Sequence, residues 1–177
     1  AQDGVQYALR PKVLALGYAY MSSSSLAARA QPLLDNLRDE LHESCSLGVI
    51  EEDEVYYVAR AEVSRIMSIA LRVGSRLPLY CTSMGRILLA AWPRSEQEAY
   101  LRRTEIMACT PKTVTQLSRI LEILEHVAEE GHAIVDEELE LGLRSVAVAV
   151  KGTGDTVKIN RTSGFIFLIS PSVILRS

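Results

Sequence analysis

Apolar side chains recur at steps of three and four through residues 26–41, a period that is typical of an amphipathic helix. The residues that carry this period are Leu26, Ala30, Leu34, Leu37 and Leu41. Pro32 lies inside the pattern, so we expect it to kink the helix or to restart it. Residues 13–20 predict an earlier helix, and the serines at 22–25 predict a break followed by an N-cap.

A second pattern, rich in β-branched and aromatic residues, predicts strands. It covers residues 45–50, 55–61, 66–73, 132–135, 143–150 and 165–170. The acidic tetrad EEDE at 51–54 separates the first two strands and predicts a hairpin turn, and GTGD at 152–155 predicts another.

Further helices are expected between the third and fourth of these strands. Ser95 with Glu98 and Thr113 with Gln116 both have the spacing of a capping box. The second helix has one apolar face and ends at Gly131; that face contains Leu117, Leu121, Leu124 and Ala128. Strands, then helices, then strands again indicate an α+β fold with a largely antiparallel sheet.

The composition of the chain argues against several classes of protein. The 177 residues are enough for one domain with a core, with 48% apolar and 23% charged residues. A net charge of −3, with no basic cluster, argues against nucleic-acid binding by this segment itself. No apolar run reaches the roughly 20 residues of a membrane span, and the N-terminus lacks the features of a signal peptide. The three cysteines, Cys45, Cys81 and Cys109, have no paired spacing, so we expect a cytoplasmic protein without disulfides.

The segment 65–92 contains the most informative chemistry. A predicted strand leads through Gly74 and Pro78 to a helix start at Thr82-Ser83, followed by apolar residues. Ser83, Met84 and Gly85 would present backbone N–H groups at the positive end of the helix dipole, which suits a carboxylate. Gly85 has no side chain and would allow a ligand to approach the backbone. The simpler alternative is that the hydroxyl group only caps a helix.

Several stretches together resemble the effector-binding domain of IclR-family transcription regulators. They are RPKVLALGYAY, LHESCSLGVIEEDEVYYVARA, IMSIALRVGSRLPLYCTSMGR and GHAIVDEELELGLRSVAV. The third is most similar to the branch that senses aromatic acids of the β-ketoadipate pathway, such as protocatechuate and 4-hydroxybenzoate. The resemblance implies a GAF/PAS-like antiparallel sheet flanked by helices. It ends at about Val150, and the tail that follows lacks the charged terminal helix of the family.

The resemblance also implies where an effector would bind. A small organic acid would lie between the helix start at 83–85 and the strand with the GLR motif, near Val135, Asp136, Leu143 and Ser145. Arg60 would be a further contact, because a guanidinium group pairs well with a carboxylate, and Met67 and Tyr80 would be apolar walls. The alternatives are that Ser145 is a small core residue, that Arg60 is a surface residue whose orientation depends on strand register, and that Met67 and Tyr80 only pack in the core.

For the whole chain, the resemblance implies three parts. Residues 1–12 would be the remnant of a winged helix-turn-helix wing, 13–25 a linker helix, and 26–177 the effector-binding domain. DNA would be bound through an N-terminal domain absent from this chain, and the protein would be a homodimer or tetramer. Effector binding would then control DNA binding allosterically.

Two other interpretations remain open. The chain could be a stand-alone sensory module, or a hydrolase that uses Ser83 at the helix start. Neither a GxSxG, a Walker nor a GxGxxG motif is present, and the acidic clusters at 51–54 and 136–140 look like solvated turns, so we expect no enzyme and no cofactor. His42, Cys45 and Cys81 give only a weak metal-binding signal, and we expect no metal.

Overall fold

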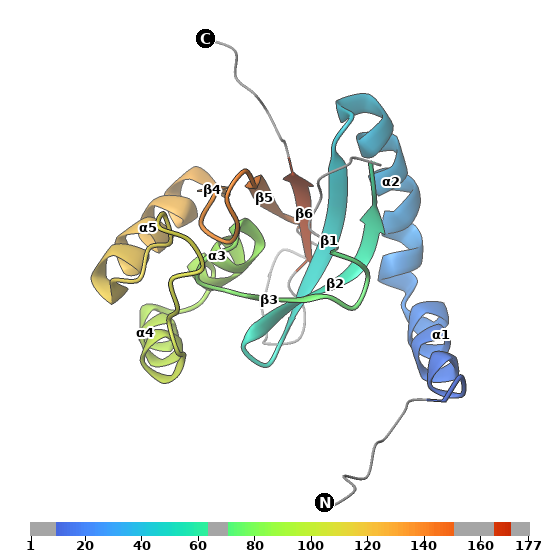
Figure 1. Cartoon of the computed structure of the whole chain (residues 1–177), viewed down its shortest axis with the longest axis horizontal. Coiled ribbons are helices and arrows are strands. Elements are labelled where there is room, and N and C mark those ends of the chain that lie inside the picture. Colours follow the sequence, from blue (N-terminus) through green and yellow to red (C-terminus); the bar gives the residue numbers. More distant parts are fainter. Residues whose placement is uncertain (1–9, 64–70, 151–164, 171–177) are drawn as a thin grey trace, which may run out of the picture.

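A six-stranded antiparallel sheet separates two groups of helices (Figure 1). This computed structural model describes residues 10–63, 71–150 and 165–170. The elements are α1 (Val13–Ser23), α2 (Ser25–Leu41), β1 (Ser44–Glu51), β2 (Glu54–Ala61), β3 (Arg76–Pro78), α3 (Ser83–Ala90), α4 (Arg94–Arg103), α5 (Leu117–Glu130), β4 (His132–Asp136), β5 (Arg144–Val150) and β6 (Phe165–Ser170). The predicted α+β class and antiparallel sheet are confirmed.

The strand order is β3-β2-β1-β6-β5-β4, and every neighbouring pair is antiparallel. The predicted acidic hairpin joins β1 to β2, and Glu52 takes a left-handed conformation with φ of 55° in its turn. The C-terminal strand β6 pairs with both β1 and β5, so it connects the two halves of the sheet. A segment far along the chain therefore completes the centre of the sheet.

Helix α2 covers one face of β1 and β2. Its buried residues Ala27, Ala30 and Leu34 pack against β1 and β2 residues that include Leu47 and Ala59. Ser24 caps the helix as predicted, because its hydroxyl oxygen accepts the backbone N–H of Ala27.

Pro32 does not restart the helix, since α2 runs through this position without interruption, and the predicted kink stays a prediction. A proline removes one backbone donor, the one that would bond to the carbonyl of Ala28. Ala28 is exposed to solvent, so water can satisfy that carbonyl.

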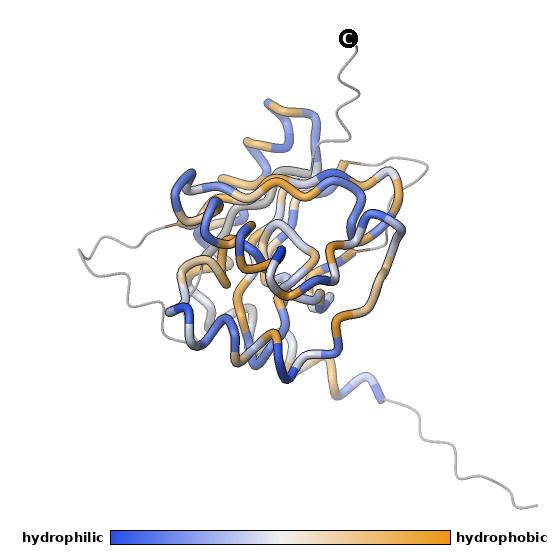
Figure 2. The backbone as a smooth tube through the Cα atoms, turned by 90° about the vertical axis from the view of Figure 1, so that its left-hand side faces the viewer, coloured by the Kyte–Doolittle hydropathy of each residue, from blue (hydrophilic) through white to orange (hydrophobic). Residues whose placement is uncertain are grey.

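Helices α3, α4 and α5 lie on the other side of the sheet (Figure 1). The main core forms there, around Leu88, Tyr100 and Leu124, and it includes the inward-facing Ala133 and Ala147 of β4 and β5. Figure 2 shows hydrophilic and hydrophobic residues alternating over short distances along the chain, as expected of elements that bury one face. None of the described helices is long and apolar enough to cross a membrane.

Both predicted capping boxes are wrong. Helix α4 starts after Pro93, whose fixed backbone angle and missing N–H suit a helix start, and no side chain caps it. Helix α5 has Gln116 at its N-cap, also without a side-chain hydrogen bond. The hydroxyl of Thr113 instead donates to the backbone carbonyl of Glu138 at 2.6 Å, a long-range contact that the local pattern did not reveal.

The predicted strand at 66–73 is not supported where it can be assessed. Residues 71–73 are not in a strand, and the third strand is the shorter β3. Gly74, with φ of 89°, turns the chain, and its N–H donates to the carbonyl of Tyr57. The rest of that prediction, residues 1–9 of the predicted wing remnant at 1–12, and the turn at 152–155 lie outside the described residues.

Candidate ligand-binding site

The start of α3 leaves polar groups without partners inside the protein. Thr82 caps the helix: its hydroxyl oxygen accepts the N–H of Gly85 at 3.1 Å and donates to the carbonyl of Pro78 at 2.7 Å. Among the described residues, the N–H groups of Ser83 and Met84 have no hydrogen-bond acceptor. The side chain of Ser83 is also buried, with 1% of the residue exposed, and its hydroxyl has no partner. A buried polar group without a partner costs free energy, so this cluster is suited to a polar ligand.

Gly85 is required by packing. A Cβ atom at this position would lie 2.1 Å from the carbonyl oxygen and 2.3 Å from the Cα of Leu79. The predicted reason for the glycine, close approach of a ligand, is therefore not needed, and its N–H already bonds to Thr82. Contact between Gly85 and an effector stays a prediction.

A β-bulge decides which side chains of β1 and β2 face α3. Leu47 pairs with Ala59 and the next residue, Gly48, pairs with Tyr57, so Val58 is the extra residue of β2. Because strand side chains alternate, the bulge changes which face the later residues of β2 occupy. Tyr57 belongs to the core on the α3 side, while Ala59 belongs to the core on the α2 side.

Arg60 consequently lies on the α3 face and is held there. Its Nη1 donates to the hydroxyl of Ser46 at 2.6 Å, and its guanidinium lies 5.8 Å from the ring centroid of Tyr57. Its Nε pairs with Glu62 at 2.9 Å, and only 8% of the Arg60 side chain is exposed. Burial raises the pKa of Tyr57 to about 12, so this phenol is neutral near neutral pH. The Arg60 side chain is thus mostly buried and paired with an acid, and its contact with an effector stays a prediction.

The side chain of Met84 connects the start of α3 to the strands β1 and β2. A Cβ at Gly48 would lie 2.5 Å from the Met84 sulfur, so the methionine side chain rests on the glycine in β1. Gly48 is paired with Tyr57, over whose ring Arg60 lies. Contacts through Gly48 and Tyr57 therefore connect Met84, at the start of α3, with the guanidinium group of Arg60.

The second predicted wall is formed by β4 and β5. Val135 and Ser145 are register partners, and both are buried, at 3% and 9% exposure. Asp136 is exposed and pairs with Arg144, with 2.6 Å between Oδ1 and Nε. Leu143 is half-buried at the end of the β4–β5 loop. The structure thus brings Val135 and Ser145 together and leaves the side chain of Asp136 at the surface.

Tyr80 is buried and bound to another segment. Its hydroxyl donates to the carbonyl of Met107 at 2.9 Å and accepts the N–H of the same residue at 3.1 Å. Burial raises the pKa of the Tyr80 phenol, and burial also raises the pKa of the neighbouring Cys81 thiol to about 12. Both groups are neutral near neutral pH. Met67 lies outside the described residues, and its predicted role is untested.

A buried ion pair behind the helix start was not predicted. Arg86 donates from Nη1 and Nη2 to the two carboxylate oxygens of Glu138, at 2.6 and 2.7 Å. The acidic cluster at 136–140 is therefore not a fully solvated turn, because Glu138 is only 7% exposed. The available signal was a single charge, Arg86, within an otherwise apolar helix.

Comparison with known proteins identifies the family. The family model described as the C-terminal domain of bacterial IclR transcriptional regulators matches residues 18–160. The chain belongs to the IclR family. This confirms the resemblance drawn from the sequence, including its similarity to the aromatic-acid branch.

Three IclR relatives are informative. The chain is 48% identical over 149 residues to the Pca regulon regulatory protein of Pseudomonas putida, covering 84% of this chain and 51% of the relative. A transcriptional regulator from Rhodococcus sp. RHA1 superimposes with a TM-score of 0.82 at 40% identity, covering 92% of this chain and 64% of that one. The inducer-binding domain of a double mutant of Acinetobacter PobR, in complex with 3-hydroxybenzoic acid, gives a TM-score of 0.74 at 28% identity, with 83% of each chain covered. The chain thus spans about half the length of the curated relative.

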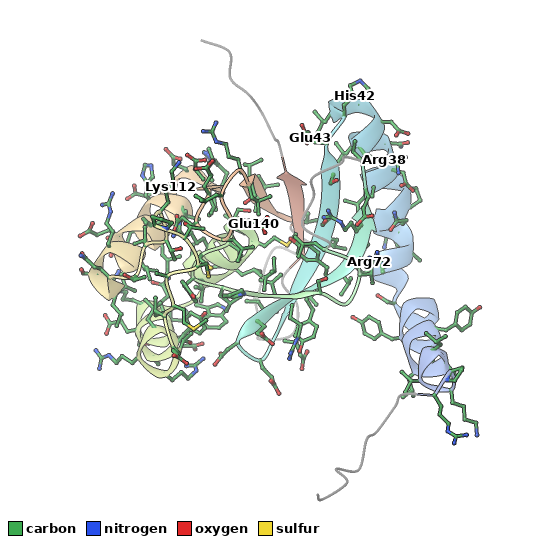
Figure 3. All side chains as sticks on the ribbon, in the orientation of Figure 1. Arg38, His42, Glu43, Arg72, Lys112 and Glu140 are labelled. Carbon is green, nitrogen blue, oxygen red and sulfur yellow. The ribbon has the colours of Figure 1, made fainter. Side chains whose placement is uncertain are left out.

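The other interpretations of this IclR domain find little support. Among the described residues, no group of three or more His, Cys, Asp and Glu side chains is placed to hold a metal ion. Figure 3 shows His42 at the far end of α2, away from α3. The relatives are named as transcriptional regulators, and among the described residues the Ser83 hydroxyl has no hydrogen-bond partner that could act as a base.

Proposed function

We propose that this IclR domain senses a small aromatic carboxylic acid and thereby controls the DNA binding of a winged helix-turn-helix domain in the same regulator. The observation that carries the proposal is the buried, unpartnered hydroxyl of Ser83 beside the free N–H groups of Ser83 and Met84. Three donors at the positive end of a helix form a site for a carboxylate. The ligand would satisfy groups that are otherwise buried without partners.

The surroundings support an aromatic acid over a small, very polar one. Val135 and Met84 offer apolar contacts, Ser145 offers a hydroxyl group, and Tyr57 and Tyr80 are neutral. Two relatives point to an aromatic acid: the PobR domain is bound to 3-hydroxybenzoic acid, and an Acinetobacter baylyi relative is named as the p-hydroxybenzoate hydroxylase transcriptional activator. Arg60 supplies a positive charge on the same face for a second polar group of the ligand.

The proposed output is regulatory and not catalytic. The relatives are named as transcriptional regulators. An effector can shift the equilibrium between two arrangements of such a regulator only by binding one of them more tightly. The charge of −3 is consistent with DNA contact through another domain, which would act on DNA in the cytoplasm.

Ser83→Ala is expected to abolish most effector binding without lowering stability. Since the hydroxyl is buried and unpartnered in the free domain, removing it should leave the melting temperature unchanged or slightly higher. In a thermal-shift titration, wild-type protein at 100 times the dissociation constant should gain about 2.7 kcal/mol of stability from the bound acid. The panel would contain 4-hydroxybenzoate, 3-hydroxybenzoate, protocatechuate, phenylacetate, β-ketoadipate, pyruvate and glyoxylate.

The matched control is Ser118→Ala, on the exposed face of α5, which should bind like the wild type. A selective shift with one aromatic acid that is lost in Ser83→Ala would support the proposal. Stabilisation by pyruvate or glyoxylate alone would reject the aromatic class. An effector that binds Ser83→Ala as tightly as the wild type would remove the helix start from the site.

We also propose that α1 is the linker helix and mediates homodimerisation. Its sequence VLALGYAYMSS contains no charge, and its large apolar side chains are exposed: Leu14 by 73%, Leu16 by 74% and Tyr18 by 76%. A helix of this composition needs a partner that covers it. A second copy of the chain would provide an equally apolar helix and a symmetric interface.

Leu14→Glu combined with Leu16→Glu should convert a dimer to a monomer, because two charges would then enter an apolar interface. Sedimentation equilibrium would measure the change, with Leu117→Glu, a half-exposed leucine at the start of α5, as the control. A wild-type chain that sediments as a monomer, or a double variant that stays dimeric, would contradict the role of α1.

A further inference from the structure

The guanidinium group of Arg86 has every nitrogen engaged inside the protein. Nε donates to the carbonyl oxygen of Tyr80 at 2.9 Å, and the two terminal nitrogens donate to Glu138 at 2.6 and 2.7 Å. Only 2% of the Arg86 side chain and 9% of the Glu138 side chain are exposed. Arg86 therefore connects its own helix both to the residue that precedes the helix start and to a distant loop.

Glu138 collects contacts from a third segment. Its Oε2 also accepts the N–H of Val114 at 2.9 Å, and its backbone carbonyl accepts the hydroxyl of Thr113. The carbonyl of the neighbouring Glu137 accepts the hydroxyl of Thr110 at 2.7 Å. The loop before α5 and the loop between β4 and β5 are thereby held together; Figure 3 marks them with Lys112 and Glu140.

The position of this network relative to the candidate site is informative. Ser83 and Met84, with their free N–H groups, lie one turn before Arg86 in α3. Val135 and Ser145 lie on the strands at either end of the loop that contains Glu138. The ion pair thus joins the helix start to the loop between the two strands of the other predicted wall.

A buried ion pair is weak evidence for stability. Removing two charges from water is costly, and replacing such a pair by neutral groups of similar size is often neutral for stability. A fully satisfied buried network does, however, specify one arrangement of the segments that it joins. Its most direct consequence is geometric precision at the neighbouring helix start.

We infer that Arg86 and Glu138 are positioning residues, which fix the α3 start against the β4–β5 loop and so set effector affinity and selectivity. This inference rests on the proposed function for its effect on ligands, but its geometric part can be tested without any ligand. Neither residue touches the effector in this account. Their action is through the placement of Ser83 and Met84 relative to Ser145.

The test is the double variant Arg86→Met/Glu138→Gln, which has no buried charge and keeps an oxygen acceptor for the N–H of Val114. Without ligand, hydrogen exchange of the hydrogen-bonded amides at 85–86 and 113–114 should become about tenfold faster, while the amides of α2 should not change. The matched control is Arg119→Met/Glu122→Gln, which removes an exposed ion pair of α5. It should leave exchange at all these positions as in the wild type.

Ligand binding provides the second readout. The double variant should bind 4-hydroxybenzoate, or the acid that stabilises the wild type most, roughly tenfold more weakly, and discriminate less between 4- and 3-hydroxybenzoate. A purely structural role would lower the melting temperature and speed exchange throughout the domain, and it would leave selectivity unchanged.

The exchange and binding experiments test the positioning role and the proposed function separately. Unchanged exchange at 85–86 in the folded double variant overturns the positioning role, as does unchanged affinity and selectivity. If the wild type binds none of the acids, the proposed function fails, and the exchange experiment still determines whether the ion pair positions the helix start.

Discussion

The single substitution Arg86→Met is expected to destabilise the domain by about 3–5 kcal/mol, because it leaves the Glu138 carboxylate buried without its partner. It also leaves the carbonyl of Tyr80 without its donor. For a domain of this size, the melting temperature should fall by roughly 6–20 °C. Thermal or urea unfolding followed by circular dichroism would measure the loss.

Two further variants test whether the loss of stability comes from the unpaired buried charge. Arg119→Met removes an exposed arginine and should change stability by at most about 0.5 kcal/mol. Arg86→Met/Glu138→Gln should recover much of the lost stability, since no buried charge remains. A single variant as stable as the wild type would show that Glu138 readily finds another partner or reaches water.

Gly85→Ala is expected to lower the free energy of unfolding by about 3 kcal/mol, at or above the upper end of typical overpacking costs. The new methyl group would lie 2.1–2.5 Å from three backbone atoms of Leu79, and backbone cannot rotate away as a flexible side chain can. Either α3 or the segment before it must move, and the helix start moves with it. Chemical denaturation would measure the stability, and the titration with acids would measure the affinity.

The control for this prediction is Gly17→Ala. In the part of the chain that the structure describes, a Cβ at Gly17 would meet no atom within 4 Å beyond its chain neighbours and the nearby helix backbone, and alanine in a helix interior is favoured over glycine by roughly 1 kcal/mol. This variant should therefore be as stable as the wild type or more stable. If Gly85→Ala folds with normal stability, the close contact with Leu79 is not a constraint on the fold.

The close packing of Gly85 restricts which substitutions can test ligand contact at the start of α3. A bulky residue at Gly85 would reduce binding by distorting the helix, whether or not a ligand contacts this position. Ser83→Ala is the better probe, because its hydroxyl has no partner to lose in the free domain. A loss of binding in that variant can be assigned to the ligand contact.

Local sequence patterns were sufficient for most elements of the fold. The period of residues 26–41 predicted α2 and its buried face, and the acidic tetrad predicted the β1–β2 hairpin. Thr82 was expected at a helix start, and it caps α3. These features depend on interactions within a few residues, which the sequence displays directly.

The capping boxes show the limit of such patterns. Thr113 and Gln116 have the required spacing, but Thr113 bonds to Glu138, 25 residues away. A threonine side chain can form a hydrogen bond with either a nearby or a distant backbone group, and only the tertiary structure decides which of the two bonds forms. The sequence motif looks the same whether the threonine caps a helix or bonds to a distant loop.

The sequence by itself determined the α+β class, most helices and strands, the helix start that could receive an acid, and the resemblance that the IclR comparison confirmed. Only the tertiary structure decided that a bulge at Val58 turns Arg60 toward α3, that Gly85 is required by the backbone of Leu79, and that Arg86 meets Glu138 across 52 residues. The physical reason is the range of the interactions. Periodicity and caps are local, whereas strand register, close backbone packing and buried ion pairs form between segments that meet only when the chain has folded.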